Sequence, residues 1–581
     1  MNNLKKQILS VAVATSTVLS CVPVSMAAIP ADVQGTRYEE PVQILSALNI
    51  MVGDENGAYR LDDTIIRSEV AKMAIHALGL EDAAESSKGQ TMFDDVSAEH
   101  WANGYINLAV SQGIIEGDGD GNFRPNAPIS YAEAMTIMVR ATGYTVSAEE
   151  NGGYPHGYMK TGTSNGLAKN VQGSYSDKIS RGNVAYLTTN ALESKLMEQT
   201  GFGSDGKYEI TEKTLLKDKL KVTKDTGRIT AIENTSLTGS SSLAKGQIKI
   251  DNKTYETAYN MNNLLGYNVT YYVKNEGKND ESVILAMPIQ NQNNDLTISS
   301  ELFSKLTTKN GNTAIEYFKD ENTSKTNTAE ISSDATLIYN GKYQAMDKSL
   351  IDLTDKSGNI TLLDSNKNGK YDIVFVKNYE NIVVDSVSST GKIVDKYSQK
   401  VLKLDDTVDF RITKGLEEIS VSDLAEYDVL SVAASLDKEL YEVEVTNKTV
   451  EGKVTGKDSK GVLINGTKYK VAANYTDSID IGSEGVFYLD TDGKIAAFDA
   501  SKTLSSNYAY LMKAYYTKNT EKASFKLFTK DGKEVTLDAN NKIKFNGKSN
   551  VKALDVVNSL NTSEDVTASQ LVTYSTNADN K

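Results

Sequence analysis

The chain has 581 residues and a formal net charge of −15, from 62 Lys or Arg and 77 Asp or Glu. At roughly 100–200 residues per domain, this length predicts about three to five domains. An acidic surface argues against binding to nucleic acid or to anionic membranes. The single cysteine, Cys21, excludes disulfides within the chain and metal sites built from cysteines.

The first 27 residues have the pattern of a secretory signal peptide. Two lysines form a charged start, an apolar run follows over 8–22, and the small residues of "SMA" suit cleavage after Ala27. The run is short for a membrane span, and no later apolar run reaches transmembrane length. A lipoprotein leader processed at Cys21 is the alternative, which Leu19 disfavours. We therefore expect a secreted protein whose mature chain has no cysteine.

The sequence changes character near residue 200. Before that point, apolar residues recur at the spacing of an amphipathic helix, as at Val70, Met73, Ala74 and Leu78, and six of the seven prolines occur there. After it, short alternating runs such as "VTYYV", "DIVFV" and "YEVEV" are typical of strands, with turn residues between them. We therefore predict a multidomain protein, all-α in its N-terminal third and mainly β afterwards.

An internal repeat organises the helical part. The segment "NIMVGDENGAYRLDDTIIRSE" at 49–69 matches "GIIEGDGDGNFRPNAPISYAE" at 113–133 without a gap. Both have an apolar helix end, a Gly-Asp turn, an aromatic–arginine pair, an isoleucine and a glutamate that opens the next helix. A degenerate third copy with a shorter turn lies at 165–187 and keeps Ile179 and Arg181.

The second copy resembles a known family. The segment "FDDVSAEHWANGYINLAVSQGIIEGDGDGNFRPNAPISYAEAM" at 93–135 contains Phe-x-Asp-Val, His-Trp-Ala, Gly-Ile-Ile-x-Gly, Phe-x-Pro and a variant of Ile-Thr-Arg-Ala-Glu. In these features it is similar to the S-layer homology (SLH) domain of bacterial surface proteins. The resemblance implies three copies, at about 38–90, 91–147 and 148–200, that build one pseudo-threefold helical unit. It also implies grooves that bind a secondary cell-wall polysaccharide on peptidoglycan, often a pyruvylated one.

The resemblance further implies which residues bind this anionic polymer. The arginine of the family motif corresponds to Arg67 in the first copy and Arg181 in the third, and arginine gives permanently charged, fork-shaped recognition of a carboxylate. The second copy has Tyr131 at this position, so that groove is either weak or binds sugar by stacking. The aspartate and tryptophan of the family motif correspond to Asp95 and Trp101.

These residues also have structural interpretations. Trp101 lies at a helix start, where packing in the core is favoured, and Asp95 precedes a helix that it is expected to cap. Glu69 and Glu133 fall in the first turn of a helix, where negative charge is stabilising, and are interpreted as structural. The third copy has Asn183 where the family has glutamate.

The β-rich part repeats loosely. A strand, a turn and a second strand recur at 269–287, 360–376, 429–445 and 485–498, and the Asn-Gly pairs of "LIYNGKY", "VLINGTKY" and "IKFNGKS" predict further hairpins. We predict five small barrels or sandwiches in a line, at 205–292, 293–380, 381–447, 448–502 and 503–581. The end, "LVTYSTNADNK", has the pattern of the first half of another hairpin. Either the last domain is incomplete or the chain is a piece of a longer one.

One turn of the β part is a weak candidate for a calcium site. The segment "DSNKNGKYD" offers oxygen ligands at Asp364, Asn366, Asn368 and Asp372. Position 12 of an EF-hand loop would be Phe375 and no flanking helices are expected, so a hairpin tip is favoured. The turn "GDGDGNFRP" of the second helical copy fails the same comparison, because Phe123 holds position 6 and Ile129 holds position 12. No other cofactor is expected.

Signatures of catalysis are missing from the sequence. It contains no His-Glu-x-x-His, no Gly-x-Ser-x-Gly and no phosphate loop, although a carboxylate pair of a glycosidase stays open. We therefore predict a structural protein of a bacterial surface of the Gram-positive type. The helical repeats are expected to anchor it non-covalently, while the β domains self-assemble into an S-layer or form a stalk. The alternatives are an adhesin or carbohydrate-binding surface protein with the same anchor and, less favoured, an anchored polysaccharide-degrading enzyme.

Overall fold

The computed structural model describes most of the chain from residue 30 to residue 574. The residues outside the description are 1–29, 202–206, 240–242, 321–322, 416, 460, 501–506, 518–521, 530–531, 540–541, 547, 564–565 and 575–581. The predicted signal peptide therefore lies outside the described residues. Among the helices that are described, none has the length and apolar character needed to cross a membrane. The chain divides into two compact units at residue 377, except that Lys356–Gly358 belong to the second unit.

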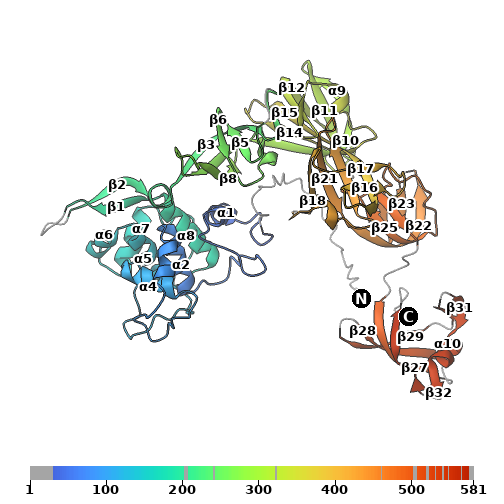
Figure 1. Cartoon of the computed structure of the whole chain (residues 1–581), viewed down its shortest axis with the longest axis horizontal. Helices are drawn as coiled ribbons and strands as arrows, with labels where there is room; N and C mark the ends of the chain where they lie inside the picture. Colours follow the sequence, from blue (N-terminus) through green and yellow to red (C-terminus); the bar gives the residue numbers. More distant parts are fainter. Residues whose placement is uncertain are drawn as a thin grey trace, which may run out of the picture. The chain divides into compact units, whose positions relative to one another are not determined.

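The part of the first unit before residue 195 is helical (Figure 1). The helices described there are α1 (Glu39–Ala47), α2 (Arg67–Ala77), α3 (Glu81–Ser86), α4 (Asn103–Ser111), α5 (Tyr131–Ala141), α6 (Thr145–Glu150), α7 (His156–Ser164) and α8 (Arg181–Glu193). Local sequence explains why α5 begins where it does. The Ser130 hydroxyl accepts the Glu133 amide at 3.3 Å, and the Glu133 carboxylate accepts the Ser130 amide at 2.7 Å, which is a capping box. The predicted change from helical to mainly β structure is confirmed.

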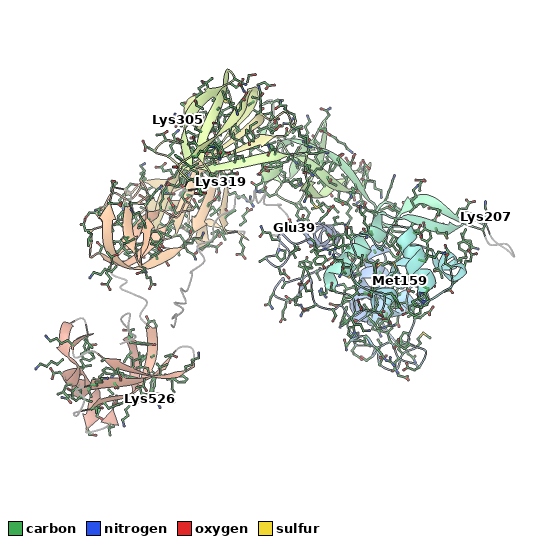
Figure 2. All side chains as sticks on the ribbon, turned by 180° about the vertical axis from the view of Figure 1, so that it is seen from behind. Glu39, Met159, Lys207, Lys305, Lys319 and Lys526 are labelled. Atoms are coloured by element: carbon green, nitrogen blue, oxygen red, sulfur yellow. The ribbon has the colours of Figure 1, made fainter. Side chains whose placement is uncertain are left out.

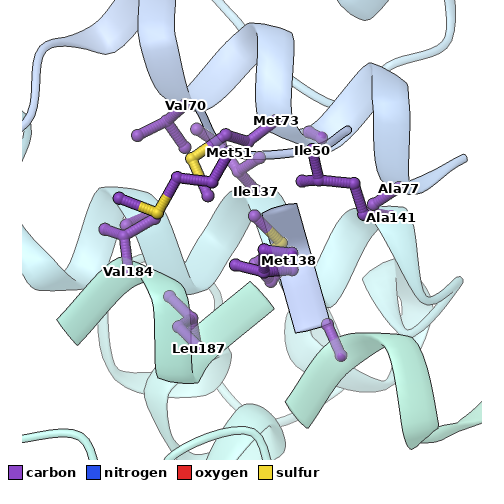
Figure 3. Close-up of a cluster of buried hydrophobic side chains, with 14 of the residues drawn as sticks. Ile50, Met51, Val70, Met73, Ala77, Ile137, Met138, Ala141, Val184 and Leu187 are labelled. Carbon is purple, nitrogen blue, oxygen red and sulfur yellow. The ribbon is translucent and has the colours of Figure 1, made fainter. Parts of the chain in front are cut away.

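Three of these helices share one hydrophobic core. Figure 3 shows Val70 and Met73 of α2, Ile137 and Met138 of α5, and Val184 and Leu187 of α8 gathered with Ile50 and Met51. These side chains are at most 4% exposed. The helical spacing read from the sequence therefore identified a buried face. Its burial is the main source of stability for helices as short as these.

Backbone hydrogen bonds join the three repeats in a cycle. The amide of Ile65 donates to the carbonyl of Ile179, Ile179 donates to Ile129, and Ile129 donates back to Ile65, each at 3.1 Å. These three isoleucines hold the same position in the three copies, just before the helices α2, α5 and α8. Each repeat is therefore bonded to both of the others at this point.

The first β-sheet follows the helices and shares their core. After the hairpin of β1 (Lys195–Gln199) and β2 (Tyr208–Thr214), its strands are β3 (Val222–Ile232), β4 (Thr235–Ser236), β5 (Gln247–Ile250), β6 (Lys253–Glu256), β7 (Asn268–Lys274) and β8 (Ser282–Pro288). The strand order is β4-β3-β5-β6-β8-β7, and β7 also pairs with β3. Leu215, Tyr272 and Leu285 are buried in the same cluster as the helical core residues.

A second group of strands completes the first unit. It consists of β9 (Asn294–Ser299), β10 (Phe303–Lys309), β11 (Asn312–Phe318), β12 (Thr326–Tyr339), β13 (Lys342–Gln344), β14 (Ser357–Asp364) and the first part of β15 (Tyr371–Val387), with the short helix α9 (Lys348–Ile351). Ile338, Leu363 and Ile373 of this group pack into the core of the first sheet. The two groups of strands therefore share buried surface.

The second unit contains three further groups of strands. The first has the rest of β15 with β16 (Lys392–Asp395), β17 (Val401–Lys403), β18 (Asp409–Lys414), β19 (Glu417–Glu418), β20 (Val429–Ala434) and β21 (Leu440–Thr446). The next is a sheet of order β24-β23-β22-β25-β26, formed by β22 (Thr449–Asp458), β23 (Gly461–Ile464), β24 (Thr467–Tyr469), β25 (Glu484–Leu489) and β26 (Ile495–Asp499).

The last group is a four-stranded sheet of order β29-β28-β27-β34. Its strands are β27 (Asn507–Thr517), β28 (Lys522–Thr529), β29 (Glu534–Ala539) and β34 (Gln570–Tyr574). Between β29 and β34 lie β30 (Lys542–Phe545), β31 (Lys548–Lys552), α10 (Ala553–Leu560), β32 (Asn561–Ser563) and β33 (Val566–Thr567). The strand that we interpreted as half of another hairpin, β34, pairs with β27 at the edge of this sheet.

The hairpins predicted from the sequence are present. The pairs β7–β8, β14–β15, β20–β21 and β25–β26 cover the four recurring strand–turn–strand segments. Two of the Asn-Gly pairs sit at the tips of β12–β13 and β23–β24. Both residues have positive φ there, 43° and 80° at Asn340 and Gly341, and 51° and 80° at Asn465 and Gly466. Positive φ at both central positions is what a type I′ turn requires.

Candidate functional site

Arg67 is the first arginine expected to bind the wall polymer. Its side chain links the first repeat to the second by hydrogen bonds. Its side chain is 8% exposed. The Nε group donates to the Phe123 carbonyl at 2.9 Å, one terminal nitrogen donates to Glu133 at 3.0 Å, and the other donates to the Glu116 carbonyl at 2.9 Å. Asp118 lies 3.8 Å away, and the guanidinium stands over the Phe123 ring. An anionic ligand would therefore compete with Glu133 for this charge.

Arg181 makes the equivalent tie between the third and first repeats. Its Nε group donates to the Tyr59 carbonyl at 2.8 Å, and a terminal nitrogen donates to Glu69 at 2.5 Å. Glu69 and Glu133 are the third residues of α2 and α5, where each also accepts the backbone amide that precedes its helix. The structural interpretation of these two glutamates is confirmed, because each carboxylate caps its own helix and binds the arginine of another repeat.

Among the residues that the structure describes, no such ion pair joins the second and third repeats. Tyr131 is 5% exposed, and its backbone amide donates to the Asp177 carbonyl at 2.9 Å, just as the amide of Arg67 donates to the Ala127 carbonyl. The glutamate position is taken by Asn183, whose side chain accepts the Gln172 amide at 3.0 Å. Arginine and glutamate are thus replaced together. A glutamate kept here without its arginine would be an unpaired charge in a partly buried place.

Asp95 binds a turn of its own repeat, so the prediction that it caps a helix is wrong. Its two carboxylate oxygens accept the amides of Phe123 at 2.8 Å and Arg124 at 2.6 Å. Asp32 of the first repeat accepts the corresponding pair, from Tyr59 at 2.7 Å and from the next residue at 2.8 Å. Phe123 therefore links two of the candidate residues, because Asp95 holds its amide and Arg67 binds its carbonyl.

Trp101 is at the surface, so the interpretation of its side chain as core is wrong. It is 48% exposed, and its ring stacks on that of His100 with the centroids 5.8 Å apart. The error arose because a position near a helix start does not determine whether the side chain faces the core or solvent. An exposed indole offers a flat apolar face, which suits stacking against a sugar ring.

Two residues that the sequence did not single out lie beside the Arg67–Glu133 pair. Tyr154 is 57% exposed, and burial together with the charge of Glu133 raises the pKa of its hydroxyl, while Ser130 and Arg67 lower it. Lys178 is exposed and its charge acts on the Glu133 carboxylate. Nothing in the sequence around these two residues distinguishes them. By contrast, Asp32 could have been identified from the sequence, because the pair Asp-Val occurs both at 32–33 and at 95–96.

Electrostatics favour the charged form of Glu133. Partial burial would raise the pKa of its carboxyl, but hydrogen bonds from Ser130 and the positive charges of Arg67 and Lys178 lower it below the ordinary value of 4.5. At neutral pH the pair is therefore ionised. The junction between the first and second repeats therefore combines an ion pair with an exposed aromatic side chain, Tyr154.

The weak calcium candidate is a turn whose oxygens bind protein groups. Asp364 accepts the amides of Asn368 at 3.2 Å and of Gly369 at 3.0 Å. Asn366 accepts the Asn368 amide at 3.1 Å. Asp372 accepts the Ser365 amide at 2.7 Å and pairs with Arg228 at 3.0 Å. Across the described part of the chain, no group of three His, Cys, Asp or Glu is arranged to hold a metal ion. Calcium binding at this turn stays a prediction.

Comparison with known proteins identifies the first two repeats. The family model of the S-layer homology domain matches residues 31–71 and 93–135. The first match begins seven residues before the start that we predicted for the first copy, and it includes Asp32. The third copy, at 148–200, lies outside the matched residues.

Relatives with surface-protein names align along nearly the whole chain. The middle cell wall protein of Brevibacillus brevis is 27% identical over 94% of this chain, and a surface layer protein of Brevibacillus choshinensis is 25% identical over 92%. A cell surface protein of Thermoanaerobacter kivui is 27% identical over 93%. This chain spans 59%, 54% and 68% of these relatives, respectively.

Enzymes match only over short stretches. An amylopullulanase of Thermoanaerobacterium thermosulfurigenes and the exoglucanase XynX of Acetivibrio thermocellus align over 19% and 20% of this chain. The long alignments are thus to surface and cell-wall proteins, while the enzymes share a short segment. The chain therefore carries two S-layer homology domains, and along most of its length it is similar to surface and cell-wall proteins of bacteria.

Proposed function

We propose that this protein is a structural component of a bacterial cell surface that is anchored to a secondary cell-wall polysaccharide by its helical repeats. The observation that carries the proposal is the match of residues 31–71 and 93–135 to the S-layer homology domain. The surface and cell-wall names of the long relatives support it, and the Gram-positive type of wall is inferred from those relatives. The chain is proposed to act without catalysis.

The anchor is proposed to be one pseudo-threefold unit of three repeats. The cycle of backbone bonds through Ile65, Ile129 and Ile179 supports this arrangement, with residues 148–200 as the third copy. The domains that follow are proposed to be small barrels or sandwiches with the boundaries given from the sequence. For 205–292, the second pairing of β3 with β7 supports a barrel.

Polymer binding is proposed at the junction that contains Arg67, and the exposed Trp101 of the second repeat is proposed as a stacking platform. The exposed Tyr154 and Lys178 support this place, because an aromatic ring and an accessible cation suit an acidic sugar such as a pyruvylated one. Arg67 and Arg181 are proposed to contribute their charge from below the surface. Tyr131 is proposed to make the remaining junction a weaker site for an anion.

The anchor is tested by sedimentation with purified cell walls. The chain without its first 27 residues should sediment with intact walls and remain in solution when the secondary polymer has been extracted from them. Equal binding to extracted walls would contradict the polysaccharide as the ligand. Replacement of the buried arginines alone is a poor test, because loss of the ties between repeats would weaken binding through the fold.

Trp101→Ala is the sharper variant, because the indole is exposed and its removal leaves the core intact. We expect wall affinity to fall about tenfold, which corresponds to about 1.4 kcal/mol for the lost aromatic contact. Tyr343→Ala, on β13 and 40% exposed, is the matched control and should bind as the unmodified protein does. Unchanged affinity of the Trp101 variant would remove this residue from the site.

A further inference from the structure

The last sheet carries a row of exposed apolar side chains. Tyr510 of β27 pairs with Leu571 of β34 on one side and with Phe528 of β28 on the other. Directly paired residues share a face, so the three side chains form one row across three strands. Tyr508, two residues before Tyr510, lies on the same face. These four side chains, the aromatic row, are 57%, 48%, 45% and 70% exposed at Tyr508, Tyr510, Phe528 and Leu571, respectively.

The opposite face of the same sheet is the packed one. Leu511 and Leu527 are at most 3% exposed and pack with Val572. Ala553 and Val557 of α10 cover Ala514 and Ala523 farther along these strands. The aromatic row is therefore not the core side of the sheet. A sheet with one covered face normally places polar residues on the other, so exposed aromatic side chains in register indicate an interaction surface.

The charge of this domain indicates the partner. Residues 503–581 contain 11 lysines and 8 Asp or Glu, which gives a net charge of +3. The whole chain has a net charge of −15, so the remainder has −18. Lys526 lies next to the row, two residues before Phe528, and is labelled on this sheet in Figure 2. It is paired with Lys513 across the strands, but its ammonium group forms an ion pair with Glu534 at 2.7 Å, so the positive charge beside the row comes from Lys513.

We propose that the aromatic row docks on the acidic part of a second copy of this chain. The basic last domain of one molecule then faces the acidic remainder of another, and the apolar side chains at the centre lose their contact with water. Complementary charge orients the two copies, and buried aromatic side chains supply most of the affinity. The contact deepens the structural role proposed above and rests on it, because it would join copies into the S-layer expected from the sequence. It leaves the anchor and its polysaccharide unaffected.

Self-association is measured by analytical ultracentrifugation of the chain without residues 1–27, at low and at high ionic strength. We expect concentration-dependent association that weakens as salt is added. Tyr510→Ser with Phe528→Ser should lower the association constant by at least about tenfold, as loss of two central aromatic side chains does. The circular dichroism spectrum should not change, because both side chains are exposed.

The matched control places the same change elsewhere in the second unit. Val401 and Ile481 are 56% and 66% exposed, and Val401→Ser with Ile481→Ser should associate as the unmodified protein does. A chain that stays monomeric at all concentrations would overturn the proposal, and so would a Tyr510 and Phe528 variant that associates normally. Loss of wall binding by that variant would make the row a glycan site and would also overturn it.

Zero-length cross-linking identifies the partner independently. A carbodiimide joins lysine to carboxylate in contact, and a mixture of unlabelled and 15N-labelled protein distinguishes links between copies from links within one. We expect mixed-isotope links from Lys513 to Asp or Glu outside 503–581. Links from this domain found only within one copy would reject the second copy as occupant. Failure of wall sedimentation with these links intact would refute the anchor alone, so the two proposals fail separately.

Discussion

At the scale of single residues, the two arginines that the family resemblance assigns to the polymer are buried between repeats. Arg67 and Arg181 each bind a carbonyl of a neighbouring turn and the third residue of a neighbouring helix. Their first role in this chain is to hold the repeats together. Any role in binding comes through the charge that they leave at the surface.

Replacing Arg67 by alanine should therefore destabilise the helical part. The change removes three hydrogen bonds and leaves Glu133 without its partner, which costs on the order of 3 kcal/mol for a largely buried pair. Thermal unfolding followed at 222 nm, where the helices dominate the signal, measures the effect. Arg124→Ala is the control, because Arg124 pairs with Asp118 and Asp120 at 54% exposure and should cost less than about 1 kcal/mol. Equal losses of stability in the two variants would contradict a stabilising role for the buried Arg67–Glu133 pair.

Glu133 should make the helical part sensitive to acid. The pKa of its carboxyl is lowered in the folded state, so the carboxylate contributes stability that is fully present above its ordinary value of 4.5 and is lost as the pH falls through the folded-state pKa. Glu133→Gln should be less stable than the unmodified protein at neutral pH and should lose less stability between about pH 5 and pH 3. Urea unfolding at a series of pH values measures both. Parallel profiles would exclude Glu133 as the titrating group.

At the scale of elements, an aspartate that lies far away in sequence fixes the turn that the arginine of another repeat binds. Asp95 and Asp32 each accept two successive amides of the turn that follows the next helix of their repeat. That same turn presents the carbonyl that the arginine of another repeat binds. Each aspartate thus positions the contact between two repeats indirectly.

Asp95→Ala should loosen that turn. Two amides would lose a charged acceptor, which costs about 1–3 kcal/mol where they stay away from water. Amide hydrogen exchange of Phe123 and Arg124 should become faster, and the 222 nm transition should move to lower temperature. The neighbouring carboxylate in Asp94→Ala is the matched control, with exchange at both amides unchanged. Protection that survives in the Asp95 variant would show that the turn is held by other contacts.

Elements that depend on neighbouring residues could be predicted from the sequence, and contacts between elements could not. Asn340-Gly341 gives its hairpin because both residues adopt positive φ, a local property. The capping role predicted for Asp95 was wrong because proximity in sequence was taken for proximity in space, whereas its partners lie 28 and 29 residues later. The exposure of Trp101 likewise depends on how helices dock.

At the scale of the whole molecule, the anchor is not a separate body on a flexible tether within the first unit. Tyr272 and Leu285 of the first sheet belong to the core of the helices, while Tyr271 belongs to the core of the sheet itself. Neighbouring residues on β7 thus point into different cores. The stability of the helices should therefore depend more on Tyr272 than on Tyr271.

This pair of tyrosines gives a matched test. Tyr272→Ala should weaken the 222 nm transition of the helices by about 3–5 kcal/mol although it lies on a strand, as for loss of a buried aromatic side chain. Tyr271→Ala, also buried, should mainly affect the unfolding of the sheets, followed by tyrosine fluorescence. Helices that melt identically in the two variants would mean that Tyr272 stabilises the helices no more than Tyr271 does.

The cycle of bonds through Ile65, Ile129 and Ile179 has a consequence for how such an anchor can evolve. A stack of repeats has two ends, so copies can be gained or lost one at a time and terminal caps protect the exposed faces. A closed ring has no end and no vacant face, as in an oligomer with rotational symmetry. Its size is therefore fixed by geometry. In the ring of three repeats proposed above, duplication could not add one copy, and stronger attachment to the wall would require a second complete ring.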